Sequence, residues 1–150
     1  MDNKIIGVIG GSNIDSKTYD NAVLVGKLIA ESGATLICGG LGGAMEAACK
    51  GAKEAGGKTI GILPTLSVDV AILYVDIPIA PGLGNGRNLI IINTAHVLIA
   101  ISGKYGTLSE IGFALQSGKP VVGLGTWEID GVISAESPQD AVKKALEYFN

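Results

Sequence analysis

Short apolar runs alternate with segments of helical spacing along the whole chain. The runs predict strands over residues 4–9, 35–38, 59–63, 73–79, 97–101 and 120–124. Between them, apolar positions three and four residues apart predict helices that start near residues 15, 44, 87, 107 and 137. Strands that alternate with helices are typical of a parallel sheet wrapped on both sides. The sequence therefore predicts an α/β fold, with a Rossmann-like, doubly wound, mostly parallel sheet in a single domain over residues 1–150.

Local signals support the ends of several helices. Asp15 or Ser16 can cap the first helix, and Ser137 with Asp140 forms a capping box at the last. The second helix carries small residues at one face. They are Ala44, Ala48, Gly51, Ala52 and Ala55. We expect this face to lie very close to the sheet.

The composition excludes several classes of protein. Hydrophobic residues are 47% of the chain and charged residues 17%, the reverse of a disordered chain. The most apolar stretch, 89–101, is interrupted by Asn93, Thr94 and His96 and is too short to cross a bilayer. Residues 1–4 lead directly into a strand without a signal-peptide layout. We therefore expect a cytoplasmic protein with no membrane association.

Charge and cysteine content narrow the partners. The net charge is −3 and no Lys/Arg cluster occurs, so we expect no nucleic acid partner. Cys38 and Cys49 lack metal-binding spacing, and with one His in the chain we expect no metal site. Few charges on an apolar chain favour a surface buried against another copy. We expect a homo-oligomer, with dimer and tetramer both open.

Glycine is concentrated in loops. It makes up 23 of the 150 residues, about twice the average usage of roughly 7%. Clusters follow three predicted strands, at 10–12, 39–43 and 103–107, and a fourth at 82–86 precedes a helix. Ligands of open α/β sheets bind at the carboxyl ends of the strands, where glycine lets backbone N–H groups approach an anion. The alternative is that these glycines only form tight strand-to-helix turns. We favour a phosphate or nucleotide site.

The common nucleotide motifs are absent. No strict GxGxxG occurs, and at residues 57–59 a P-loop would require Gly where Ala52 stands. The segment 102–110 is more informative, because Gly103 and Gly106 can shape an anion-binding turn. Thr107 would cap the next helix or bind a phosphate oxygen. Glu110 would complete a capping box or act on a ribose. Arg87, the only Arg, starts a helix where the dipole disfavours a cation, which suggests a ligand or an acidic partner.

These motifs resemble the Rossmann-like family of the LOG phosphoribohydrolases, the so-called lysine decarboxylases. The resemblance is carried by residues 8–12, 39–47 (GGLGGAMEA), 86–88 and 106–110 (GTLSE), in that order. Within the family the chain is most similar to the molybdenum-cofactor-carrier-like branch. The hydrolases have a Pro-Gly-Gly-x-Gly-Thr-x-x-Glu motif and an upstream Arg, which implies Arg87 and Glu110 as catalytic residues if the protein is an enzyme. Ser102, Lys104 and Asn88 depart from the hydrolase pattern.

Two functions therefore remain open. One is a protein that binds a nucleotide, a phosphate or a molybdopterin-type cofactor. The other hydrolyses the N-glycosidic bond of a nucleoside 5′-monophosphate, with Glu110 holding ribose or orienting water. Neither requires a cofactor for its chemistry, and no lysine is singled out for a Schiff base. The residues predicted to bind the ligand are Gly10, Gly11, Ser12, Gly39, Gly40, Gly43, Met45, Arg87, Asn88, Gly103, Lys104, Gly106, Thr107 and Glu110. Tyr105 is a candidate to cover a base, and Trp127 to line an oligomer contact or pack locally.

Overall fold

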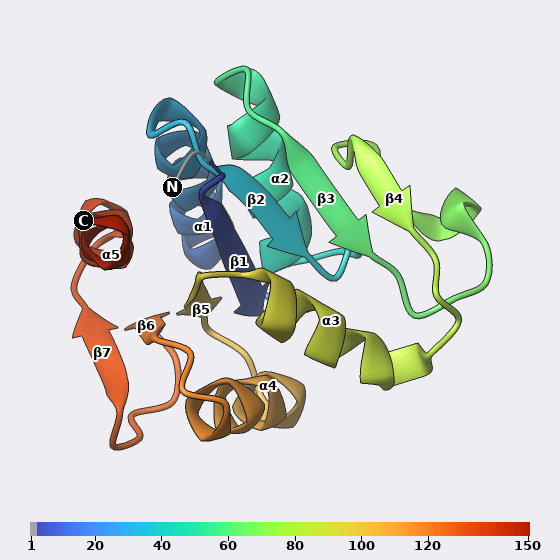
Figure 1. Ribbon diagram of the computed structural model, residues 1–150. Coiled ribbons are helices and arrows are strands. Elements are labelled where there is room, and N and C mark those ends of the chain that lie inside the picture. The colour runs from blue at the N-terminus through green and yellow to red at the C-terminus, as the bar shows by residue number, and fades with distance from the viewer. Residues whose placement is uncertain (1–2) are drawn as a thin grey trace.

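Seven parallel strands form one sheet in the computed structural model, which describes residues 3–150 (Figure 1). The strands are β1 (Ile5–Gly10), β2 (Thr35–Cys38), β3 (Thr59–Ile62), β4 (Ile77–Ile79), β5 (Val97–Ile101), β6 (Val121–Leu124) and β7 (Val132–Ala135). Their order across the sheet is β4-β3-β2-β1-β5-β6-β7. The predicted α/β architecture is confirmed. Met1 and Asp2, part of the N-terminal segment considered above, lie outside the described residues.

Five α-helices cover the two faces of the sheet. They are α1 (Ser16–Glu31), α2 (Ala44–Glu54), α3 (Arg87–Thr94), α4 (Tyr105–Gln116) and α5 (Pro138–Leu146). Short 3₁₀ turns occur at η1 (Val68–Val70), η2 (Gly84–Gly86) and η3 (Glu147–Phe149). Helices α1, α2 and α5 lie on one face, and α3 and α4 on the other (Figure 1). Among residues 3–150, no helix has the length and apolar character to span a membrane. The cytoplasmic location stays a prediction.

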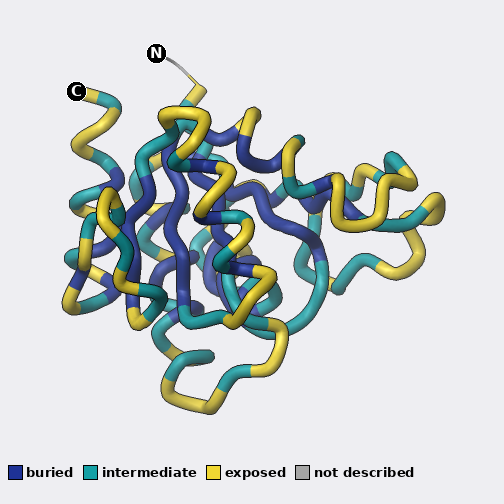
Figure 2. Tube along the Cα trace, turned by 90° about the horizontal axis from the view of Figure 1, so that it is seen from below, coloured by how far each residue is buried: buried dark blue, intermediate teal, exposed yellow. Residues whose placement is uncertain are grey.

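The central strands β1, β2, β5 and β6 are buried from both sides, as their apolar runs predict. In β1, Ile6 and Val8 pack into the layer of α1, α2 and α5, while Ile9, the next residue, packs into the layer of α3 and α4. Successive side chains of a strand point to opposite faces, so one apolar run supplies both layers. Figure 2 shows the buried strands at the centre of the molecule and the exposed residues at its periphery.

Two helix starts test the capping predictions. The Thr18 N–H donates to Asp15 Oδ1 at 2.7 Å, and the Asp140 N–H donates to Ser137 Oγ at 3.0 Å, so both caps are confirmed. The prediction for α4 is wrong. This helix begins at Tyr105, two residues before Thr107, and its N-cap Lys104 makes no side-chain capping bond.

The small-residue face of α2 makes its closest approach to a helix rather than to the sheet. A Cβ added at Gly51 would overlap the carbonyl of Val23 in α1, and one added at Gly26 would overlap the carbonyl of Ala48 in α2. Glycine is required on both sides of this crossing because backbone touches backbone. The sequence predicted that this face lies very close to the sheet, but its tightest contact is with α1.

The chain reverses its direction of travel across the sheet at β1 and β5. From β1 it runs through β2 and β3 to the edge strand β4, then returns by α3 to β5 on the other side of β1. In such sheets the connections after the two central strands diverge to opposite faces and leave a crevice between them. The topology therefore opens a site at the carboxyl ends of β1 and β5.

Candidate functional site

A cleft of about 710 Å³ occupies the position that the topology predicts. It is lined from the ends of β1 and β5, from the β2–α2 loop and from α3 and α4. All of the predicted ligand-binding residues except Gly40 and Gly43 line it: Gly10, Gly11, Ser12, Gly39, Met45, Arg87, Asn88, Gly103, Lys104, Gly106, Thr107 and Glu110. The structure thus brings together positions that lie up to 100 residues apart in the sequence.

Gly40 and Gly43 lie behind the cleft wall. Both have a positive φ, 74° for Gly40 and 71° for Gly43, and both are crowded by neighbouring segments. A Cβ on Gly40 would press on Leu63, and one on Gly43 would overlap the backbone of Gly11 and Ser12. These two glycines let the β2–α2 loop approach its neighbours closely. Their role is therefore that of a tight strand-to-helix turn, the alternative to ligand binding given in the sequence analysis.

The β5–α4 loop has an unusual backbone. Ser102 has φ 54°, in the left-handed region that side chains other than glycine adopt rarely, and Gly103 follows with φ 97°. A Cβ at Gly103 would overlap the Thr107 side chain, which is buried over it. Thr107 therefore packs against the turn instead of capping α4.

The first turn of α4 has free backbone donors, and two of its residues, Gly106 and Thr107, line the cleft. Because no side chain caps this helix, the N–H groups of residues 105–107 have no acceptor within the described chain. The partial positive charge of a helix N-terminus and the exposed Lys104 ammonium act in the same direction. Gly106, also in this turn, has open space around its Cα. This turn is suited to bind an anion such as a phosphate.

The segment after β6 holds the β5–α4 loop from behind. Thr126 Oγ1 donates to the Ser102 carbonyl at 2.6 Å, and Trp127 Nε1 donates to the Lys104 carbonyl at 2.9 Å. The Tyr105 and Trp127 rings lie with centroids 6.0 Å apart. Trp127 thus has a local packing role, and neither ring lines the cleft. Thr126 and Trp127 thus bind two carbonyls of this segment, while the N–H groups of residues 105–107 have no acceptor in the described chain.

Arg87 lines the cleft with a buried side chain that bonds to two strand ends. The residue is 7% exposed; its Nε donates to the Ile62 carbonyl at 2.7 Å and its Nη2 to the Gly39 carbonyl at 3.4 Å. Its Nη1 donates to Asn88 Oδ1 at 2.8 Å. Arg87 therefore ties the ends of β2 and β3 together while bringing a positive charge to the site. Burial lowers the pKa of Arg87, and the nearby Glu110 carboxylate opposes this shift.

Glu110 is the carboxyl group of the cleft. It lies in the second turn of α4, too far along the helix to cap it, so the capping-box alternative is wrong. Burial raises the pKa of Glu110 to about 7, and the positive charge of Arg87 works in the opposite direction. No direct ion pair joins Glu110 to Arg87. A carboxyl group of this kind exchanges its proton close to neutral pH.

The cleft also has an apolar side that the sequence analysis missed. Phe113 of α4 and Leu89 of α3 line it, although 51% and 41% of their surfaces are exposed. Leu41 and Met45 add apolar surface from the β2–α2 segment. A signal was available in the sequence, because Phe113 lies seven residues after Gly106 and three after Glu110, on the same face of the helix. Phe113 was missed because an apolar residue in a helix is ordinarily assigned to the core.

Other candidate residues have structural roles. His96 Nδ1 accepts the Ile5 N–H at 3.1 Å, and its ring makes an edge contact with Phe149. Cys38 and Cys49 are buried free thiols with their Sγ atoms 3.5 Å apart. Within residues 3–150, no cluster of three or more His, Cys, Asp or Glu side chains is placed to hold a metal ion.

Comparison with known proteins places the chain in a family. A protein of Archaeoglobus fulgidus is 48% identical over 142 residues, covering 94% of this chain and 93% of its own length. The molybdenum cofactor binding protein of Rippkaea orientalis has a TM-score of 0.93 at 37% identity, with 99% of this chain and 98% of that chain covered. The molybdenum cofactor carrier protein of Chlamydomonas reinhardtii has a TM-score of 0.90 at 37% identity, with 98% of both chains covered. Residues 3–148 match one family throughout, and the chain belongs to the SLOG cluster4 family.

Proposed function

We propose that the protein binds a nucleotide or a phosphorylated, molybdopterin-type cofactor in this cleft, with the phosphate at the first turn of α4. The observation that carries the proposal is the set of N–H groups at residues 105–107, which have no acceptor in the described chain, in a turn whose Gly106 and Thr107 line the cleft. Lys104 and the charge of Arg87 add positive potential around it. The likeness to molybdenum cofactor binding and carrier proteins supports a cofactor-binding role.

Binding of simple phosphate compounds tests this proposal. The purified protein is titrated with adenosine and guanosine 5′-monophosphate and with inorganic phosphate by calorimetry, and Lys104→Ala is compared with Lys58→Ala. Lys58 is exposed and does not line the cleft, so it is a matched control. We expect Lys104→Ala to weaken binding about tenfold and Lys58→Ala to leave it unchanged. Absence of binding, or equal losses in both variants, contradicts the proposal.

Phosphoribohydrolase activity is a second candidate, favoured by Glu110. Its pKa of about 7 and its position in the cleft near Arg87 are typical of a carboxyl group that takes part in a reaction. Glu110 would hold the ribose or orient water while positive charge develops on the sugar. Release of free base and ribose 5-phosphate from a nucleoside monophosphate, lost in Glu110→Gln, is the expected result. Binding without release in the unmodified protein excludes this candidate.

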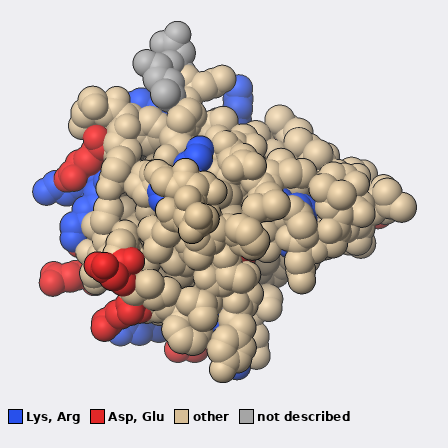
Figure 3. Space-filling model, turned by 60° about the horizontal axis from the view of Figure 1, so that its bottom comes forward, with Lys and Arg blue, Asp and Glu red and all other residues tan. Residues whose placement is uncertain are grey.

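We also propose that a second copy of the chain covers an apolar surface around β4. Its exposed residues are Leu66, Val68, Val70, Leu73, Ile77 and Ile79. On the face shown in Figure 3, most charged side chains gather on one side of the molecule and the other side is largely uncharged. Sedimentation is expected to show a dimer or tetramer that Ile79→Lys dissociates. A monomeric unmodified protein contradicts this proposal.

A further inference from the structure

Helix α4 places three different chemical groups in a line along the cleft. Gly106, Glu110 and Phe113 all line it, and their spacing of four and three residues puts them on one face of the helix. With a rise of 1.5 Å per residue, Glu110 lies about 6 Å and Phe113 about 10 Å along the axis from Gly106. Anion-binding N–H groups, a carboxyl group and an aromatic ring therefore follow one another in a fixed order.

Phe113, the last residue in this line, has an exposed surface that no packing contact explains. Phe113 leaves 51% of its surface uncovered, and Leu89 on the neighbouring α3 leaves 41%. Both line the same cleft, one from each helix that borders it on this face of the sheet. Apolar and aromatic surface of this kind inside a cleft is where ligand sites gain most of their contact area.

We infer that Phe113 and Leu89 form a subsite for a planar aromatic ring, so that α4 selects ligands with a phosphate at one end and a ring at the other. The inference rests on the proposed function, because it takes the phosphate to lie at the first turn of α4. The roughly 10 Å between the two ends suits a ligand whose phosphate and ring are joined by a sugar or a comparable hydroxyl-bearing unit. Glu110 lies level with this middle unit and can accept hydrogen bonds from its hydroxyls.

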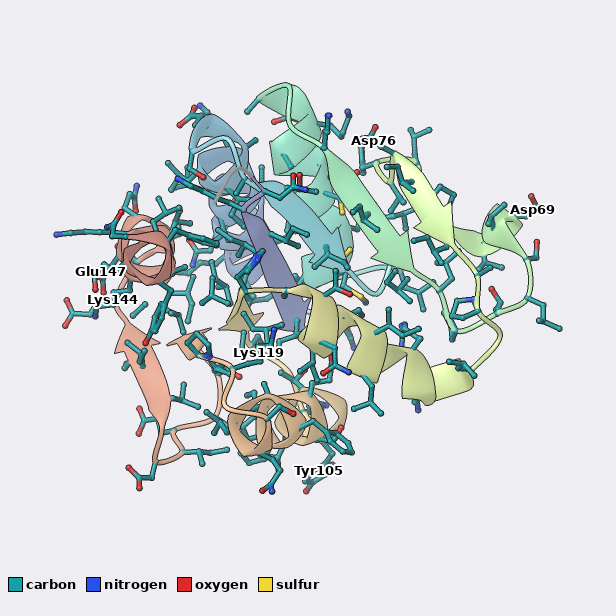
Figure 4. The ribbon with its side chains drawn as sticks, viewed as in Figure 1. Asp69, Asp76, Tyr105, Lys119, Lys144 and Glu147 are labelled. Atoms are coloured by element: carbon teal, nitrogen blue, oxygen red, sulfur yellow. The ribbon has the colours of Figure 1, made fainter. Side chains whose placement is uncertain are left out.

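A tyrosine away from the cleft supplies a matched control. Tyr148 of η3, directly after Glu147, which Figure 4 labels beside α5, is also aromatic and 48% exposed, and it does not line the cleft. If exposed aromatic surface anywhere on the molecule were enough for binding, truncation of Tyr148 and of Phe113 would have equal effects. The inference requires that they differ.

Calorimetric titration with two probes tests the inference. Guanosine 5′-monophosphate has both phosphate and ring, whereas ribose 5-phosphate has no ring. We expect Phe113→Ala to weaken binding of the nucleotide about 5- to 100-fold, the range of base–aromatic stacking, and to leave ribose 5-phosphate unchanged. Phe113→Leu, which keeps apolar bulk without an aromatic face, should give an intermediate loss. Tyr148→Ala should bind both probes as the unmodified protein does.

The outcomes separate this inference from the proposed function. If the unmodified protein binds neither probe, the phosphate site fails and the inference fails with it. If it binds both probes equally well, or if Phe113→Ala weakens both to the same extent, the phosphate site stands and the ring subsite is wrong. Circular dichroism identifies a variant that has lost its fold, and Phe113→Leu then replaces Phe113→Ala in the comparison.

Discussion

Two glycine-rich loops after β2 and β5 look alike in the sequence and have different roles in the structure. In the 39–43 loop, neighbouring segments leave no room for a side chain at Gly39, Gly40 and Gly43. Gly39 lies against Arg87 and Met45, and Gly43, with φ 71°, lies against the backbone of Gly11 and Ser12. In the β5–α4 segment, Gly103 is crowded by Thr107, but Gly106 has open space around it. The glycines of the first loop allow close packing, while Gly106 leaves a backbone accessible from the cleft.

The two loops are held by different hydrogen bonds. At the first loop, the Ala44 N–H that begins α2 donates to the Gly11 carbonyl at 2.9 Å, and the Gly40 carbonyl accepts the Ile72 N–H at 3.2 Å. At the second loop, Thr126 and Trp127 bind the carbonyls, and the N–H groups of the first turn of α4 remain without an acceptor in the described chain. Neither α2 nor α4 has a side-chain cap, so the two loops are distinguished by the space around their glycines and not by free N–H groups alone.

Substitution of Gly43 by Ala should have the largest effect. The new Cβ would overlap the Gly11 backbone. The alanine would also have to adopt φ 71° with ψ −131°, a conformation nearly restricted to glycine. We expect a loss of at least about 3 kcal/mol in the free energy of unfolding, since strain and overpacking add. Urea denaturation measures it. A loss below about 1 kcal/mol would contradict the packing role of this loop.

The sequence predicted the sheet better than it predicted the loops. Buried strands such as β1 and β5 are recognisable because they are apolar throughout, whereas β7 was missed because it is a short, half-exposed edge strand. The start of α4 was misplaced because Lys104 and Tyr105 are not typical of a helix start. Most ligand-binding candidates line the cleft because strand ends converge at one edge of a parallel sheet. The exposure of Phe113 depends on tertiary packing, which no local pattern reveals.

Replacement of Glu110 by Gln should change how stability depends on pH. The folded pKa of about 7 lies above the ordinary value of 4.5, so between these pH values the folded state holds a proton that the unfolded state has released. Stability therefore falls as pH rises from about 4.5 to 7, and the full cost persists above 7. Glu110→Gln should flatten this decline and raise stability at pH 8 by about 2 to 3 kcal/mol. If the stabilities of the unmodified protein and of Glu110→Gln depended on pH in the same way in denaturation experiments, Glu110 would not be a buried carboxyl group that titrates near neutral pH.

Replacement of Thr126 by Val should loosen the β5–α4 loop at a moderate cost in stability. The change removes the 2.6 Å bond to the Ser102 carbonyl and keeps the size of the side chain. We expect a loss of about 1 kcal/mol in stability and faster amide hydrogen exchange at Ser102, whose N–H donates to the Leu124 carbonyl at 3.2 Å. Exchange in the 39–43 loop should not change, because that loop makes its own contacts. Equal acceleration in both loops would mean that they are not held independently.

Substitution of Gly106 by Ala should have the smallest effect on stability and separates folding from binding most clearly. An added Cβ meets nothing within 4 Å, and Ala favours the helix over Gly by about 0.5 to 1 kcal/mol. Urea denaturation should therefore show a protein as stable as the unmodified one or slightly more stable, the opposite of Gly43→Ala. Because Gly106 lines the cleft, the methyl group should obstruct the approach of a phosphate to the backbone and weaken nucleotide binding in calorimetry. A destabilised Gly106→Ala protein would show that this glycine, too, serves packing, and the distinction between the two loops would be lost.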